Sequence, residues 1–160
     1  MSARRGALDP GTRGIVVTSM ATLEDVARLA TQLPDVTTGE HHGNRTWSVG
    51  GKAFAWDRPF SKADIRRFGT TAPPDGPILA VRVADLAEKE AVLATASMAF
   101  FTIPHFNGYA AVLIQLKNAK MRELREAIVD AWFACAPPPL ADAYLAQRSA
   151  SPGQVRRRRR

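Results

Sequence analysis

The stretch that decides the fold is RTWSVGGKAFAW, residues 45–56, in which large and small side chains alternate on both sides of two central glycines. This period of two is typical of strands, and a Gly-Gly loop suits a type I′ turn because both loop positions need a positive φ. The register of such a turn pairs Trp47 with Phe54 and Arg45 with Trp56 on one face. The other face then carries the small side chains of Thr46, Ser48, Ala53 and Ala55. We therefore predict a β-hairpin whose aromatic face packs against helices while its other face stays open.

The segments on either side of this hairpin predict helices and further strands. Apolar residues recur at helical spacing from Leu23 to Leu33, and Thr22 with Asp25 forms a capping box at the start. Capping pairs and proline or glycine stops divide the rest of the chain. The predicted helices cover 61–67, 85–96, 118–136 and 140–147, and the predicted strands cover 78–83, 99–103 and 110–116. This order predicts an α+β fold in which helices pack on one face of a mainly antiparallel sheet.

The net charge of +7 belongs to the two ends of the chain. Residues 1–19 carry three arginines against one aspartate, and residues 156–160 are five consecutive arginines. Residues 20–150 hold fourteen basic and fourteen acidic side chains, so the body of the protein is neutral. Within the body, residues 45–82 carry seven Lys and Arg against three Asp, which favours either a basic patch or an ordinary mixed surface.

The length of 160 residues fits one domain. We predict a single domain at residues 20–148. It is preceded by a disordered N-terminal extension at 1–19 and followed by a flexible arginine-rich tail at 149–160. The single cysteine, Cys135, excludes an intramolecular disulfide and is ordinary for a reducing cytoplasm, where we expect the protein. No apolar run approaches the roughly 20 residues that span a bilayer, so we expect no membrane association.

Five segments of the chain form a recognisable set. They are LPDV at 33–36, WSVGGKAFA at 47–55, FFTIPHFNGY at 100–109 and the helix end DAW at 130–132, followed by APPPL at 136–140. Together they resemble the MmcQ/YjbR family of small bacterial proteins from about residue 20 to residue 148. The segment at 102–109 is the most specific part of this resemblance.

The resemblance implies a two-layer sandwich related to CyaY and frataxin, described as a double wing. It also implies DNA binding, which in the family rests on structural analogy. Family members often carry a Lys-Arg pair at the last helix junction, where this chain has Pro138-Pro139. Any phosphate contact that such a pair makes in relatives is missing from this chain.

The first candidate site is the hairpin with the segment after it. Lysine and arginine side chains there would contact a nucleic-acid backbone with little base specificity. The residues are Arg45, Lys52, Arg58, Arg66 and Arg67. The alternative interpretation is that the aromatic residues are core, that Arg45 stacks on Trp56, and that the charges keep an edge strand soluble.

The second candidate site is the loop at 102–109, which carries His105, Asn107 and Tyr109. These side chains offer donors, acceptors and a stacking surface for a nucleotide or other small ligand, and a histidine suits acid–base chemistry. The alternative is a turn in which Pro104 bends the chain and Asn107-Gly108 supplies positive φ.

Neither a metal site nor an enzyme is indicated by the motifs. His41-His42 has no Cys or His at ligand spacing nearby, and the chain holds three His and one Cys in all. Phosphate-binding loops, dinucleotide fingerprints and nucleophile elbows are absent from the sequence. We therefore expect a non-enzymatic DNA-binding protein without a cofactor, or alternatively a small-ligand or protein-interaction module that uses the loop at 102–109.

Overall fold

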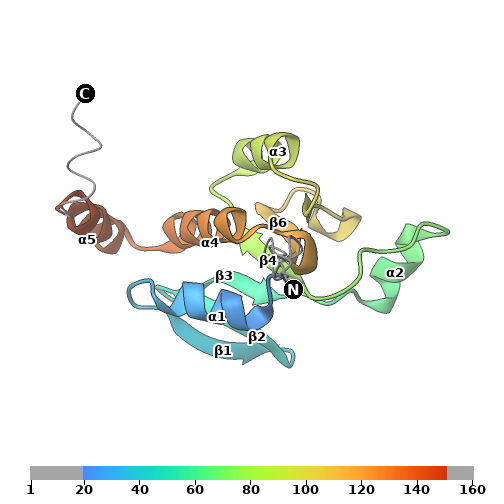
Figure 1. The fold of residues 1–160 in the computed structure, drawn as a ribbon, viewed down its shortest axis with the longest axis horizontal. Helices are drawn as coiled ribbons and strands as arrows, with labels where there is room; N and C mark the ends of the chain where they lie inside the picture. Colours follow the sequence, from blue (N-terminus) through green and yellow to red (C-terminus); the bar gives the residue numbers. More distant parts are fainter. Residues whose placement is uncertain (1–19, 151–160) are drawn as a thin grey trace, which may run out of the picture.

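One antiparallel sheet organises the computed structural model, which describes residues 20–150. Its strands are β1 (Thr37–His41), β2 (Asn44–Val49), β3 (Lys52–Asp57), β4 (Ile78–Arg82), β5 (Phe100–Phe101) and β6 (Ala111–Gln115). Their order across the sheet is β1-β2-β3-β4-β6-β5, and every neighbouring pair is antiparallel (Figure 1). The predicted α+β fold with an antiparallel sheet is confirmed, but the helices are not all on one face, because α2 (Lys62–Phe68) packs on the face opposite the main helical layer.

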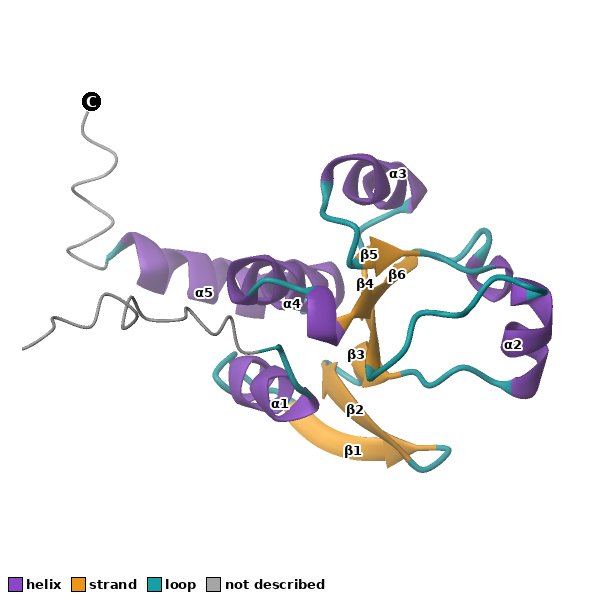
Figure 2. Ribbon diagram, turned by 45° about the vertical axis from the view of Figure 1, so that its right-hand side comes forward, coloured by secondary structure: helices purple, strands orange, loops and turns teal. Residues whose placement is uncertain are grey.

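The main helical layer consists of α1 (Leu23–Thr31) and α4 (Met121–Cys135), which cover one face of the sheet (Figure 2). The other helices are α2, α3 (Leu86–Thr95) and α5 (Pro138–Ser149), with short 3-10 turns at Pro104–Phe106 and Leu116–Asn118. Thr22 and Ser61 both form the predicted capping boxes, with Asp25 and Asp64 respectively. These caps satisfy backbone N–H groups that a helix start otherwise leaves without partners.

Two hydrophobic clusters of unequal size lie on the two faces of the sheet. Along β4, Leu79 and Val81 face the larger cluster with α1 and α4, whereas Ile78 and Ala80 face a smaller one. Four phenylalanines complete the smaller cluster, which we call the aromatic cluster: Phe60, Phe68, Phe101 and Phe106. Since Phe60 precedes α2 and Phe68 is its last residue, the aromatic cluster attaches α2 to the second face of the sheet.

The predicted hairpin is present, but one residue of β3 changes its register. Ser48 faces Ala53 as expected, whereas Trp47 faces Ala55, which leaves Phe54 as the extra residue of a β-bulge. Phe54 and Ala55 are therefore both buried in the larger cluster. After the bulge, the residues of β3 point to the opposite faces from those predicted. Trp56 therefore pairs with Thr46 and lies on the face of the sheet that α1 and α4 do not cover. The predicted pairing of Trp47 with Phe54 and the predicted contact of Arg45 with Trp56 are wrong for this reason.

Strand β1 was not predicted, because none of its five residues is apolar and all five are exposed. It is joined to β2 by a tight turn in which both His42 (φ 53°) and Gly43 (φ 78°) have left-handed backbone. Histidine is among the few residues other than glycine that tolerate this region. The first hairpin therefore precedes the one that the sequence predicts.

The remaining differences lie at element ends. β5 has two residues instead of five, and α4 begins at Met121, three residues later than predicted, because the predicted first residue, Asn118, ends a 3-10 turn. α5 runs from Pro138 to Ser149, which is longer at both ends than predicted. The extension predicted at 1–19 and the residues 151–160 of the predicted tail lie outside the described residues.

The β2–β3 turn provides a test of the packing between the sheet and the α4–α5 junction. Gly50 and Gly51 both have positive φ, of 59° and 79°, but only at Gly50 would a Cβ meet another residue, at 2.9 Å from Pro137 Cδ. We expect Gly51→Ala to lower the free energy of unfolding by about 1 kcal/mol, the cost of left-handed backbone. Gly50→Ala should lower it by roughly 1 kcal/mol more, because Pro137 must also move. Urea unfolding measures both changes, and equal losses would contradict this packing.

Candidate functional site

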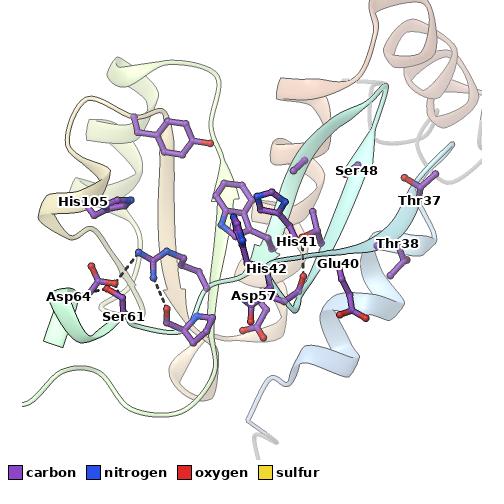
Figure 3. Close-up of a pocket in the computed structure, with 18 of the residues that line it drawn as sticks. Thr37, Thr38, Glu40, His41, His42, Ser48, Asp57, Ser61, Asp64 and His105 are labelled. Carbon is purple, nitrogen blue, oxygen red and sulfur yellow. Dashed lines mark hydrogen bonds and ion pairs between the residues drawn. The ribbon is translucent and has the colours of Figure 1, made fainter.

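A groove of about 1080 Å³ lies on the second face of the sheet, over β1, β2 and β3 (Figure 3). The strands form the floor of the groove. Short side chains, including Thr46, Ser48 and Ala53, make up most of this floor, and the Trp56 ring lies beside them. The other wall of the groove comes from residues 57–67 and from the loop at 104–109. All three histidines of the chain, His41, His42 and His105, line it. The open face predicted for the hairpin is therefore a concave surface rich in polar and aromatic groups.

Asp64 organises the α2 side of the groove. Its side chain is almost fully buried and accepts the backbone N–H of Ser61 at 2.9 Å. The same carboxylate lies 3.0 Å from Arg58 and 3.8 Å from Arg67. Burial alone would raise the pKa of Asp64, but the hydrogen bonds from Ser61 and Arg58 outweigh it and hold the pKa below its ordinary value. The carboxylate is therefore charged at neutral pH and ties two arginines to the start of α2.

Lys89 and Arg82 hold the loop that carries Tyr109. Lys89 is buried on α3 and its Nζ donates to the backbone carbonyls of Phe106 at 2.6 Å and Tyr109 at 2.8 Å. Burial lowers the pKa of this ammonium group. Arg82 donates to the Tyr109 hydroxyl at 2.8 Å. The Tyr109 ring, 39% exposed, is thus fixed at its backbone and at its hydroxyl.

The five predicted backbone-contacting residues do not form one surface. Arg45 lies on the helix-covered face, where it pairs with Glu24 at 2.7 Å and stacks over Trp47. Lys52 is exposed at the start of β3, beside the turn and outside the groove. Arg58 and Arg67 line the groove, and Arg66 is exposed on α2 without lining it. Three of the five residues are therefore brought together around α2.

The loop at 102–109 divides between two surfaces. His105 and Tyr109 line the groove, opposite the β1–β2 hairpin. Asn107 instead lines a small depression against α3. The structure thus joins part of each predicted site, Arg58 and Arg67 with His105 and Tyr109, into a single groove.

Three groove residues, Trp56, His41 and His42, are absent from the sites predicted from the sequence. Strict alternation predicts Trp56 in the core, on the same face as Phe54, and the bulge makes this prediction wrong. The available signal was the run of four apolar residues at 53–56, which departs from an alternation of apolar and polar residues. In the sequence, the adjacent pair His41-His42 suggests only a metal ligand. Their position follows from β1, whose polar sequence hides the strand.

The groove is lined by polar and aromatic side chains. Within residues 20–150, no group of three or more His, Cys, Asp or Glu side chains is placed to bind a metal ion. Nor does any helix of that region combine the length and apolar character needed to cross a membrane. The side chains present suit hydrogen bonding and stacking on a bound molecule.

These features define a class of protein: a small α+β domain with a polar, aromatic groove on the open face of an antiparallel sheet. The chain belongs to the YjbR family, whose sequence model matches residues 31–134. It is 43% identical over 130 residues to the uncharacterized protein Mb2600 of Mycobacterium bovis and to the uncharacterized protein Rv2570 of Mycobacterium tuberculosis. The alignment covers 79% of this chain and 98% of each relative. No solved structure matches the chain.

The Asp64 arrangement predicts a charge-dependent stability. Asp64→Asn keeps the shape of the cap but leaves Arg58, whose side chain is only 18% exposed, without its anion. We expect a loss of about 3 kcal/mol in the free energy of unfolding at neutral pH. Arg67→Gln, at a half-exposed arginine 3.8 Å from the carboxylate, should cost less than about 1 kcal/mol.

The negative charge of Asp64 also makes the stability difference between the wild type and Asp64→Asn depend on pH. Because the pKa of Asp64 is lowered by folding, its stabilisation is complete above the ordinary value of 3.8 and is lost as the pH falls through the lower folded value. The stability gap between the wild type and Asp64→Asn should therefore shrink on acidification below about pH 4. Urea unfolding across this range measures it, and a gap independent of pH would show that the charge is unimportant.

Proposed function

We propose that this protein is a non-enzymatic binding protein whose small-molecule ligand occupies the groove. The observation that carries this proposal is the convergence of His105 and Tyr109 with His41, His42 and Trp56 on one concave surface that the fold leaves uncovered. Sites of this kind, with a few polar groups around apolar and aromatic ones, are where small ligands bind. A volume of about 1080 Å³ is sufficient for a ligand of several hundred daltons.

Binding is favoured over catalysis by the partners of the polar groups. The Ser61 hydroxyl, which lines the groove beside Asp64, accepts the backbone N–H of Asp64 at 3.1 Å and serves as a helix cap. Within residues 20–150, no histidine side chain is hydrogen-bonded to a serine, threonine or carboxylate. An activated nucleophile needs such a base within hydrogen-bond reach. We therefore propose binding roles for the histidines, as donors and acceptors toward a ligand.

A groove-filling substitution tests the proposal. Ser48→Phe places a ring over the floor of the groove, and Leu86→Phe adds a ring at an exposed position of α3 outside it. We would screen a panel of mononucleotides, aromatic acids and amino acids by NMR of the labelled protein. The expected hits shift resonances of groove residues in the wild type and in Leu86→Phe, and lose at least tenfold in affinity in Ser48→Phe. Hits that bind Ser48→Phe unchanged would contradict the proposal.

Duplex DNA at α2 is the second candidate, because the exposed surface of this helix is basic. Lys62, Arg66 and Arg67 are exposed, whereas the one acidic residue of the helix, Asp64, is buried. Three cations on two turns of helix would suit contacts to a phosphate backbone. The body of the protein as a whole is neutral, so this surface would act locally.

A salt titration tests the second candidate in the full-length protein. Neutralising two phosphates contributes about 1.8 to the slope of log affinity against log salt. We expect the double substitution Arg66→Gln/Arg67→Gln to reduce the slope by that amount for duplex DNA. Arg122→Gln/Arg125→Gln on α4 removes the same charge and should leave the slope unchanged. Equal effects of the two double variants would show that binding depends on net charge alone, and would exclude α2 as the DNA-binding surface.

A further inference from the structure

We infer that the groove selects a planar aromatic ring that carries one anionic group, as in a mononucleotide or an aromatic acid. The inference rests on the proposed function, because it takes the groove to be the binding site. It follows from three properties of the groove: a fixed pair of aromatic rings, a shallow floor of small side chains, and one incompletely paired arginine.

The aromatic pair consists of Trp56 and Tyr109. Their ring centroids lie 6.4 Å apart and the ring planes are inclined by 52°, so the two rings form a corner. Neither ring is free to turn away, since Trp56 packs against the aromatic cluster and Tyr109 is bonded to Arg82 and Lys89. Rings held in this way stack on a planar ligand at little cost in conformational entropy.

The floor beside Trp56 favours a flat ligand. Thr46 and Ser48 on β2 and Ala53 on β3 present short side chains to this face. Of these, Thr46 is the direct cross-strand partner of Trp56. A ring stacked against the indole would therefore lie over short side chains and would meet no bulky one from the neighbouring strand. A branched aliphatic ligand would leave much of this surface uncovered.

The charges that face the groove favour a single anion. Arg58 donates to the carbonyl of Pro59 at 2.6 Å and pairs with Asp64 at 3.0 Å, so its guanidinium is largely committed. Arg67 is 49% exposed and lies 3.8 Å from Asp64, which leaves N–H groups for a ligand. Since Asp64 balances one of the two arginines, the α2 wall carries one net positive charge.

Two further acidic residues, Glu40 and Asp57, are part of the groove lining, but their positions on the strands direct their side chains to the other face of the sheet. The cross-strand partners of Glu40 and Asp57 are Arg45 and Leu79, and both partners belong to the helix-covered face. Residues opposite one another in an antiparallel pair point to the same side of the sheet. Figure 3 accordingly shows the carboxylates of Glu40 and Asp57 directed away from His41. These groups do not oppose an anion at Arg67.

Histidines complete the site from both walls. His41 at the end of β1 and His105 in the 3-10 turn line the groove, and within residues 20–150 neither side chain makes a hydrogen bond. A neutral imidazole offers one donor and one acceptor. They can therefore bond to polar atoms at the edge of a bound ring, while Arg67 holds the anion.

Adenosine monophosphate carries both an aromatic ring and an anionic group, and two related compounds test these groups separately. Adenosine lacks the anion, and ribose 5-phosphate lacks the ring. In calorimetric titrations of the full-length protein, we expect adenosine monophosphate to bind at least tenfold more tightly than either part. Arg67→Gln should weaken adenosine monophosphate about tenfold, as expected for one charge-assisted contact, and leave adenosine unchanged. Arg66→Gln, at the neighbouring arginine outside the groove, should change neither.

The ring is tested separately by Trp56→Leu and Tyr109→Leu, each of which should weaken both adenosine monophosphate and adenosine. Thermal unfolding verifies that these variants fold, and Arg67→Gln remains informative if one does not. A parallel titration with 1-naphthoate distinguishes the source of the chemistry. Tighter binding of adenosine monophosphate indicates a nucleotide, and tighter binding of naphthoate indicates an aromatic acid.

Two results would overturn the inference. One is equal weakening by Arg66→Gln and Arg67→Gln, and the other is the absence of binding by both adenosine monophosphate and naphthoate. Neither result removes the proposed function if other panel members bind the wild type and lose affinity in Ser48→Phe. If no ligand is sensitive to Ser48→Phe, the proposed function itself fails.

Discussion

Phe54 has no partner across the β2–β3 ladder, and this unpaired residue sets the two faces of the sheet. Because Phe54 and Ala55 both turn toward α1 and α4, the next residue, Trp56, must turn away from them. The larger cluster thereby holds Ala55 in place of Trp56, and the opposite face gains an indole over short side chains. The groove depends on this exchange. Without the bulge, Trp56 would be core and the open face of the hairpin would carry only small residues.

The architecture was predictable wherever local chemistry agreed with tertiary packing. The Thr22 and Ser61 capping boxes, the Gly50-Gly51 turn and the buried strand β4 all follow from side-chain types at fixed spacings. β1 was not predictable in this way. An edge strand whose five residues are all exposed carries no apolar period, so its pairing with β2 is known only once β2 is placed.

The candidate site shows why residue type alone identifies only some of the residues that line it. Charge counting singled out a basic segment, yet Arg45 is used to bind α1 through Glu24, and Arg58 is used to neutralise Asp64. Lys89 is the opposite case, since a lysine on a helix is expected in solvent and here is buried to hold two carbonyl groups. In each case a tertiary contact decides whether a charged side chain is available to a ligand, and no spacing rule anticipates that contact.

The two walls of the groove are anchored to different parts of the molecule. β1, β2 and β3 are continuous with the larger cluster, whereas α2 and the loop at 104–109 rest on the aromatic cluster and on the bonds made by Asp64 and Lys89. Substitutions under one wall can therefore change its position without moving the other wall. Replacing aromatic residues under α2 would widen or narrow the opening while the strands stay where they are. One scaffold of this kind can carry grooves of different widths that differ in a handful of phenylalanines.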